Sequence, residues 1–190
     1  LTSVTRDDLA DGGARIFAQT ISALEEKESV TGVEVLIPDF GGNRDALRTV
    51  LGAGPIVLNH NVETVPELYA SVRPEADYRQ SVQVLRQASA EGHVVKSGVM
   101  VGLGETRTQL RAVFADLAAS GVGILTIGQY LRPVTTAVPV RKIYAAEEFS
   151  ELHEEAKAAG IDRVVAGTYV RSSYRAAESY EAVHEKFDPR

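Results

Sequence analysis

Lys96-Ser-Gly-Val-Met-Val-Gly-Leu-Gly-Glu105-Thr106 is the stretch that decides the fold of this 190-residue chain. It reads as a buried strand that runs out into a glycine turn, with Glu105 and Thr106 opening the next helix. Glycine carries no Cβ, so a flat ligand can lie directly against the main chain of such a strand. The stretch therefore predicts a strand–turn–helix unit with an edge that faces a ligand.

The same alternation of short apolar runs and amphipathic helices continues along the whole chain. Strands that alternate with helices of about 10–15 residues indicate βαβ units and a parallel sheet. Because no GxGxxG follows the first strand, a barrel or partial barrel is favoured, with its chemistry at the carboxyl ends of the strands. We predict strands at residues 33–38, 56–58, 94–101, 124–127 and 163–169, and helices at residues 14–28, 45–52, 65–72, 78–91, 107–119 and 146–159.

The charge balance is acidic, with 20 Lys and Arg against 26 Asp and Glu and a formal net charge of −6. This balance argues against a nucleic-acid partner. No apolar run approaches the length of a membrane span, and the polar residues 2–8 do not form a secretory signal. We therefore expect a soluble, cytoplasmic protein with no membrane partner.

The chain contains no cysteine. Disulfides are therefore excluded, and so is any thiolate-bound metal held by this chain alone. Leu1 is not a methionine, and residues 1–4 read as the end of an apolar run already in progress. We expect the chain to be a fragment of a longer protein.

Polar and glycine-rich residues follow the predicted strands, and several of them allow two interpretations. Asp11-Gly12-Gly13 is either a capped turn before a helix or a loop that receives a polar group such as an amine. Asp39 either caps the helix that follows it or faces the mouth of the barrel. The sequence leaves both alternatives open.

Residues 59–64, Asn-His-Asn-Val-Glu-Thr, form the most polar strand end. Strand alternation directs Asn59, Asn61 and Glu63 to one side and His60 to the other. The first face suits ribose hydroxyls or an ammonium group, although Glu63 and Thr64 could simply cap the next helix. A lone histidine such as His60 is more typical of a structural residue than of a metal ligand.

Lys96 lies inside an apolar run, where an ammonium is costly to bury without a partner. In a barrel mouth it could form a Schiff base, as in aldolases. It could equally snorkel from the start of the strand. Further along, Gln129 and Tyr130 either read and stack against a heterocycle or are an ordinary loop glutamine and core tyrosine.

Gly98-x-Met100-x-Gly102-x-x-Glu105 resembles the adenine-binding strand motif of the radical S-adenosylmethionine (SAM) enzymes. A wider set of motifs resembles those of one family among them, the lipoyl synthases, in the same order and over roughly residues 1–176. These motifs are Asp7-Asp8-x-x-Asp11-Gly12-Gly13-Ala14, Pro38-Asp39-Phe40, Asn59-His60-Asn61-x-Glu63-Thr64-Val65, Tyr69-x-x-Val72-Arg73-Pro74, Lys96-Ser97-Gly98, Gly102-Leu103-Gly104-Glu105-Thr106, Thr126-Ile127-Gly128-Gln129-Tyr130-Leu131 and Val170-Arg171-Ser172-Ser173-Tyr174.

The resemblance implies an α/β fold, a partial TIM-like (β/α)6 radical-SAM barrel over residues 1–176 that starts at about its second strand, with a tail at residues 177–190. It implies that Ser173 is a metal ligand, to the iron of an auxiliary cluster, and no catalytic side chain is expected. The residues expected to bind S-adenosylmethionine are Gly12, Gly13, Asn59, Asn61, Glu63, Lys96, Gly98, Met100, Gly102, Glu105 and Gln129.

The lipoyl synthases use S-adenosylmethionine and two [4Fe–4S] clusters. The resemblance implies sulfur insertion at C6 and C8 of an octanoyl-lysine on a lipoyl-carrier protein or domain, with ferredoxin or flavodoxin as the reductant. The cysteine motifs that hold both clusters would precede Leu1. Because clusters need thiolates, we expect these residues alone to be inactive.

Some residues depart from the family pattern. Ala14 stands where many superfamily members have Glu, and Arg132 and Thr168 replace the more usual residues of the family. These changes leave the substrate tunnel and the carrier contacts open. Two alternatives remain, a metal-free Schiff-base aldolase barrel that uses Lys96 and a non-catalytic barrel that only docks a carrier domain.

Overall fold

The computed structural model describes residues 1–184 and contains one parallel sheet in the order β1-β2-β3-β4-β5. Each strand pairs with the next in sequence, so every connection crosses over in the same sense along the sheet. The strands are β1 (Glu34–Leu36), β2 (Val57–Asn59), β3 (Val95–Val101), β4 (Ile124–Gln129) and β5 (Arg163–Gly167). All five strands predicted from the sequence are therefore confirmed.

The start of the chain lies beside β1 and extends the sheet. Thr2 forms a parallel bridge with Leu36, whose amide donates to the carbonyl of Leu1 at 2.8 Å. Residues 1–2 thus form a short additional edge of the sheet beside β1. This arrangement, together with the strand order, confirms the predicted partial TIM-like α/β fold.

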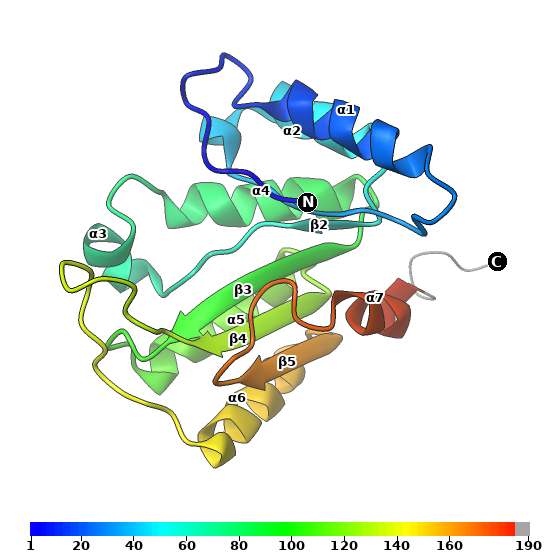
Figure 1. Cartoon of the computed structure of the whole chain (residues 1–190). Helices are drawn as coiled ribbons and strands as arrows, with labels where there is room; N and C mark the ends of the chain where they lie inside the picture. Colours follow the sequence, from blue (N-terminus) through cyan, green and yellow to red (C-terminus); the bar gives the residue numbers. More distant parts are fainter. Residues whose placement is uncertain (185–190) are drawn as a thin grey trace.

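Five helices cover one face of the sheet (Figure 1). They are α1 (Ala14–Glu25), α2 (Arg44–Leu51), α4 (Tyr78–Ala90), α5 (Arg107–Ala119) and α6 (Ala146–Ala158). The two central strands are buried almost continuously, because β4 is buried throughout and only Met100 of β3 is partly exposed. Such nearly continuous burial is expected of parallel strands that have neighbours on both faces.

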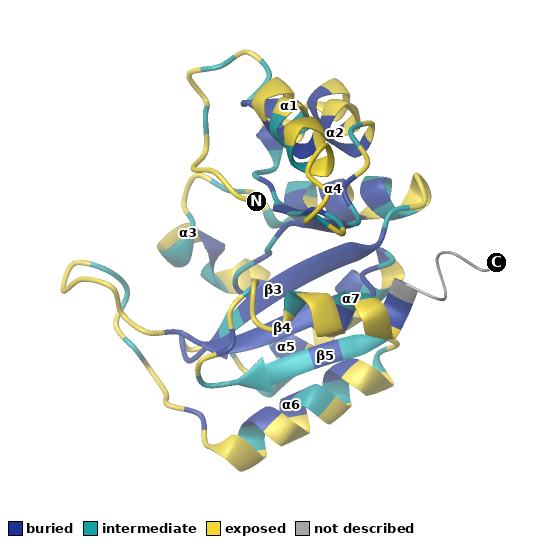
Figure 2. Ribbon diagram, turned by 45° about the vertical axis from the view of Figure 1, so that its right-hand side comes forward, coloured by how far each residue is buried: buried dark blue, intermediate teal, exposed yellow. Residues whose placement is uncertain are grey.

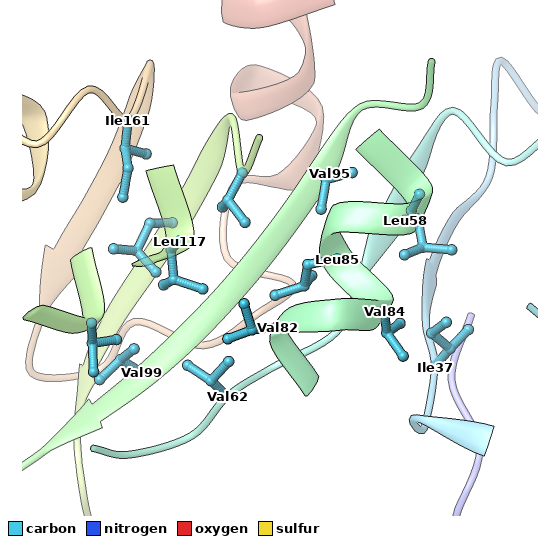
Figure 3. Packing of buried hydrophobic residues seen from close by; sticks show 14 of the residues in the cluster. Ile37, Leu58, Val62, Val82, Val84, Leu85, Val95, Val99, Leu117 and Ile161 are labelled. Atoms are coloured by element: carbon cyan, nitrogen blue, oxygen red, sulfur yellow. The ribbon is translucent and has the colours of Figure 1, made fainter. Parts of the chain in front are cut away.

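The core lies between this helical layer and the sheet. Val82 and Leu85 of α4 lie against Val95 and Val99 of β3, and Leu117 of α5 joins the same cluster (Figure 3). Alternation along β3 then turns Gly98 and Met100 to the opposite face of the sheet. The helices therefore fix the strands from behind and leave the concave face available.

Short elements follow the strands at their carboxyl ends, on the left in Figure 1. They are η1 (Phe40–Gly42), η2 (Pro66–Leu68) and α3 (Tyr69–Val72). The prediction of one α-helix over residues 65–72 is thus wrong, because this segment contains a 3-10 turn followed by one turn of α-helix. A 3-10 turn begins at Pro66, and Arg73 leaves the helical region because a proline follows it.

The last described element, α7 (Ala176–His184), lies on the concave side near the amino ends of the strands (Figure 1). Its Val183 packs with Val57, Val94 and Ile124 at the starts of β2, β3 and β4. The segment predicted as a tail at residues 177–190 is therefore helical as far as residue 184, and its last six residues lie outside the described part.

The helical layer supplies a direct stability test at Leu85, which is fully buried. We predict that Leu85→Ala lowers the free energy of unfolding by about 2–5 kcal/mol, because the lost side chain leaves a cavity. The exposed neighbour Arg86 provides the control, for which Arg86→Ala changes the same quantity by no more than about 0.5 kcal/mol. Urea unfolding followed by circular dichroism measures both, and equal effects would contradict this packing.

Candidate functional site

A cavity of about 800 Å³ opens on the concave face of the sheet. It receives residues from the ends of β2, β3 and β4 and from the segment that follows β5. The polar and glycine residues that line it are Thr2, Gly32, Glu34, Asn59, Asn61, Glu63, Gly98, Thr126, Gly128, Arg171, Ser172 and Ser173. Residues far apart in the sequence thus meet in one cavity, as expected for the chemistry of a parallel barrel.

Asn61 is the centre of the hydrogen bonds in this cavity. Its Nδ2 donates to Ser172 Oγ at 2.8 Å and to Glu63 Oε1 at 3.2 Å, while Ser172 Oγ lies 3.2 Å from its Oδ1. The pair Asn61–Ser172 joins segments 111 residues apart. Asn61 therefore ties the end of β2 to the segment that carries Ser173.

Glu63 is half-buried, with its carboxyl group beside Asn61. Its φ is 65°, and its main chain bridges to Val99 in a parallel manner. Burial raises the pKa of Glu63, although the hydrogen bond from Asn61 and the charge of Arg73 act in the opposite direction. A buried carboxyl with few partners is a suitable acceptor for a donor group on a ligand.

Two glycines form a side-chain-free wall of the cavity. A methyl group on Gly98 would lie 2.7 Å from Asn61 Oδ1 and 2.9 Å from Thr126 Oγ1. On Gly128 it would overlap the carbonyl oxygen of Val170. Both positions therefore need glycine, because neighbouring protein atoms occupy the space that a Cβ would take.

Lys96 is fully buried, and its Nζ lies 2.8 Å and 3.1 Å from the two carboxylate oxygens of Glu34. Lys96 is not among the residues that line the cavity, whereas Glu34 and Asn59 are. Asn59 Nδ2 is 3.5 Å from Glu34 Oε1, and its Oδ1 has no hydrogen-bond partner among the described residues. The ion pair occupies the ammonium of Lys96, which weighs against the Schiff-base alternative.

Glu105 and Gly102 belong to the turn after β3 rather than to the cavity wall. The Glu105 carboxylate accepts from the amides of Gly102, Leu103 and Gly104 at 2.7–3.1 Å and from the Tyr144 hydroxyl at 2.9 Å. Gly102 has φ 104°, which disfavours other residues. Both residues shape the glycine turn, and their predicted contact with a cofactor stays a prediction.

Gln129 is buried and likewise committed to the protein. Its Nε2 donates to the carbonyls of Val101, Tyr130 and Lys142 at 3.0–3.1 Å, and its Oε1 accepts from the amide of Tyr144. Gln129 therefore anchors the long connection between β4 and α6. We also expected Gln129 to bind the edge of a heterocycle. That contact stays a prediction, and the hydrogen bonds that Gln129 makes within the protein do not favour it.

Gly12 and Gly13 precede α1 and are not among the cavity-lining residues. The Asp11 carboxylate accepts from the amides of Gly13 and Arg15, so this loop is a capped turn. Asp39 also acts locally, since it accepts from the amide of Gly41 and from Gln80. Contact of Gly12 and Gly13 with a methionyl group stays a prediction.

His60 confirms the expected alternation, because it lies on the side opposite Asn59 and Asn61. It is fully buried, and its Nδ1 lies 2.9 Å from the carbonyl oxygen of Ile37. Burial lowers the pKa of His60 and keeps the ring neutral. This histidine has a structural position rather than a place in the cavity.

Ser173 is exposed and lines the cavity. Within residues 1–184 there is no group of three or more His, Cys, Asp or Glu side chains that could hold a metal ion, and the chain has no cysteine. The residues present therefore do not fit an iron–sulfur cluster on their own. They do fit a polar organic ligand, because Asn61, Glu63 and Ser172 line a cavity of about 800 Å³.

Sequence reasoning missed Ser172, Thr126 and Gly128 as cavity residues. Ser172 belongs to the Val170–Tyr174 motif, but its bond to Asn61 is a long-range contact without a local signal. Thr126 and Gly128 belong to the Thr126–Leu131 motif, and the register that pairs Gly98 with Thr126 is the signal that could identify Thr126 as a cavity residue.

Among residues 1–184, none of the helices combines the length and the apolar character needed to cross a lipid bilayer.

A comparison with protein families matches residues 1–117 to the radical SAM superfamily. Among curated proteins, the chain is 51% identical to the lipoyl synthase of Nitratidesulfovibrio vulgaris, and the match covers 96% of this chain and 61% of that protein. It is 54% identical to the lipoyl synthase of Symbiobacterium thermophilum, over 94% of this chain and 56% of the relative. The resemblance found in the sequence is thus confirmed, and the chain spans about three fifths of the length of these relatives.

Solved structures agree on the fold. A domain of pyruvate-formate lyase-activating enzyme from Bacteroides vulgatus aligns with a TM-score of 0.61 and 7% identity, covering 88% of this chain and 98% of that one. Methylornithine synthase aligns with a TM-score of 0.55 and 14% identity, covering 90% and 61%. These likenesses concern the fold alone.

The raised pKa of Glu63 gives a pH-dependent stability prediction. In the unfolded chain Glu63 has the ordinary pKa of 4.5 and loses its proton around that pH. In the folded state the same carboxyl keeps its proton to a higher pH. Stability is therefore lost as the pH rises through the folded pKa. We predict that Glu63→Gln has a higher free energy of unfolding than the wild type at about pH 8 and no advantage at about pH 4.

Denaturant unfolding at both pH values measures this difference, with the exposed Glu75→Gln as the control variant. The prediction is contradicted if Glu63→Gln raises the free energy of unfolding by the same amount at both pH values, or by the same amount as Glu75→Gln. Burial would then not penalise the charged carboxylate.

Proposed function

This chain belongs to the radical SAM superfamily, and we propose that it supplies the S-adenosylmethionine-binding and substrate-facing part of a lipoyl synthase. The observation that carries the proposal is the single cavity in which Asn61, Glu63 and Gly98 meet the segment of Ser173. Sequence identity of about half to curated lipoyl synthases supports the choice within the superfamily.

The polar side chains of the cavity suit the sugar and amino-acid ends of S-adenosylmethionine. The amide hydrogens of Asn61 are donated to Ser172 and Glu63, whereas its Oδ1 can accept a second hydrogen bond, and Glu63 offers an acceptor for a hydroxyl or an ammonium group. The adenine ring is placed against the strand segments of Gly98 and Gly128, because both glycines line the cavity. These residues bind and orient the cofactor, while Met100 and Leu36 supply apolar lining that excludes water.

S-adenosylmethionine, when bound and reduced, supplies a radical able to remove hydrogen from an unactivated carbon. In the proposed reaction sulfur enters at C6 and C8 of an octanoyl-lysine on a lipoyl-carrier domain, with electrons from ferredoxin or flavodoxin. The thiolates for the iron–sulfur clusters have to come from residues other than these 190, which include no cysteine. We therefore propose that this chain alone is inactive, with Ser173 as an iron ligand only when those thiolates are present.

Cofactor binding by this chain is measured by calorimetry with S-adenosylmethionine. We predict that Asn61→Ala weakens binding about tenfold, because a charge-assisted or buried hydrogen bond contributes about 1–1.5 kcal/mol. Gln83→Ala removes an exposed amide from the outer helical layer and serves as the matched control. Equal affinity of both variants would place the cofactor away from Asn61.

Catalysis is tested in a chimera that adds the part of the Nitratidesulfovibrio vulgaris relative not covered by this chain. After anaerobic reconstitution with iron and sulfide, we expect 5′-deoxyadenosine and a lipoylated carrier. Ser173→Ala should abolish the lipoylated product and leave S-adenosylmethionine affinity within about twofold. Formation of 5′-deoxyadenosine without any lipoylated carrier in the wild-type chimera would refute the lipoyl synthase proposal.

A further inference from the structure

The connection between β4 and α6 contains a surface that we call the cationic rim, residues 130–144. This segment includes Arg132, Arg141 and Lys142 and no Asp or Glu, although the chain has a net charge of −6. Figure 2 shows it as a largely exposed loop beyond the carboxyl ends of the strands. Its charge is therefore opposite to that of the molecule as a whole.

Two of the three cations are not compensated by a carboxylate. Lys142 pairs with Glu148, but the guanidinium of Arg132 donates only to main-chain carbonyls of its own loop, those of Ala137 and Thr135. The side chain of Arg141 makes neither a hydrogen bond nor an ion pair within residues 1–184. Arg132 and Arg141 thus present their charge to solvent.

The cationic rim also exposes large apolar side chains. Leu131 is 46% exposed, Val134 is 59% exposed and Ile143 is 65% exposed. Apolar side chains beside uncompensated cations are typical of a protein–protein contact in which electrostatics guides the encounter. A polynucleotide would require more cations than these.

Internal contacts hold the cationic rim in one shape. The Tyr130 hydroxyl donates to the carbonyl of Val138 at 2.8 Å, and the amide of Arg141 donates to that of Gly102 at 2.8 Å. Gln129 binds the carbonyl of Lys142 at 3.0 Å. A loop that is ordered in advance loses less conformational entropy when a partner binds.

A second cavity connects the cationic rim with the site. It has a volume of about 380 Å³ and lies between the rim residues Pro133 and Val138 and the residues Val72 and Arg73 of the α3 region. Glu63 and Met100 line both this cavity and the large one. A side chain inserted beside the rim would therefore reach the concave face of the sheet.

We propose that the cationic rim is the docking surface for an acidic carrier domain, whose acylated lysine enters through the cavity between Val138 and Val72. This inference rests on the proposed function and adds to it the position and charge of the carrier contact. Arg132 and Arg141 attract acidic side chains of the carrier, and Leu131, Val134 and Ile143 pack against its apolar residues.

The test measures binding of an octanoylated lipoyl-carrier domain to this chain by calorimetry at low and high salt. The variant Arg132→Glu with Arg141→Glu is compared with Arg79→Glu with Arg86→Glu, which reverses two exposed charges on α4 and so changes the net charge equally. We expect the rim variant to weaken binding about tenfold or more and to reduce its salt dependence. The α4 variant should keep wild-type affinity.

Circular dichroism and thermal unfolding first confirm that both variants are folded. If the carrier binds the rim variant as well as it binds the α4 variant, the docking surface is wrong while the proposed function stands. If the carrier fails to bind the wild type under every salt condition, the proposed function itself is contradicted. Loss of binding in the rim variant alone supports the proposal.

Discussion

The side-chain amide of Asn61 is the interaction on which the site depends. It lies at the end of β2, hydrogen-bonds Glu63 on its own segment and binds Ser172 on the segment after β5. Without this contact the concave face would be a row of strand ends with no connection across the opening of the sheet. The helical layer packs against the outer face of the sheet. The hydrogen bond between Asn61 and Ser172 joins the end of β2 to the segment after β5 across the cavity.

Buried charge is the second constraint on this face. Lys96 is fully buried and needs Glu34, and removal of either partner would leave an uncompensated charge in a site of low polarity. Among the described residues Glu63 forms no salt bridge, and burial raises its pKa. The same cavity thus contains one carboxylate satisfied by the protein and one suited to an external donor.

Local signals in the sequence predicted most of the fold. The helix at Arg107–Ala119 has the predicted bounds, because Thr106 and Gln109 form a capping box next to the glycine turn. The sequence could not reveal that Glu34 partners Lys96 across 62 residues or that Ser172 meets Asn61 across 111. Nor could it reveal that Glu105 and Gln129 hold their own loops, since their partners are mainly main-chain groups that no composition pattern identifies.

A crystal structure of the chain soaked with S-adenosylhomocysteine shows where the cofactor binds. We expect density for the ligand on the concave face, with its adenine against Gly98 and a polar group within hydrogen-bond distance of Asn61 or Glu63. Ligand density only outside that cavity, for example between α6 and β5 beside His153, would contradict it.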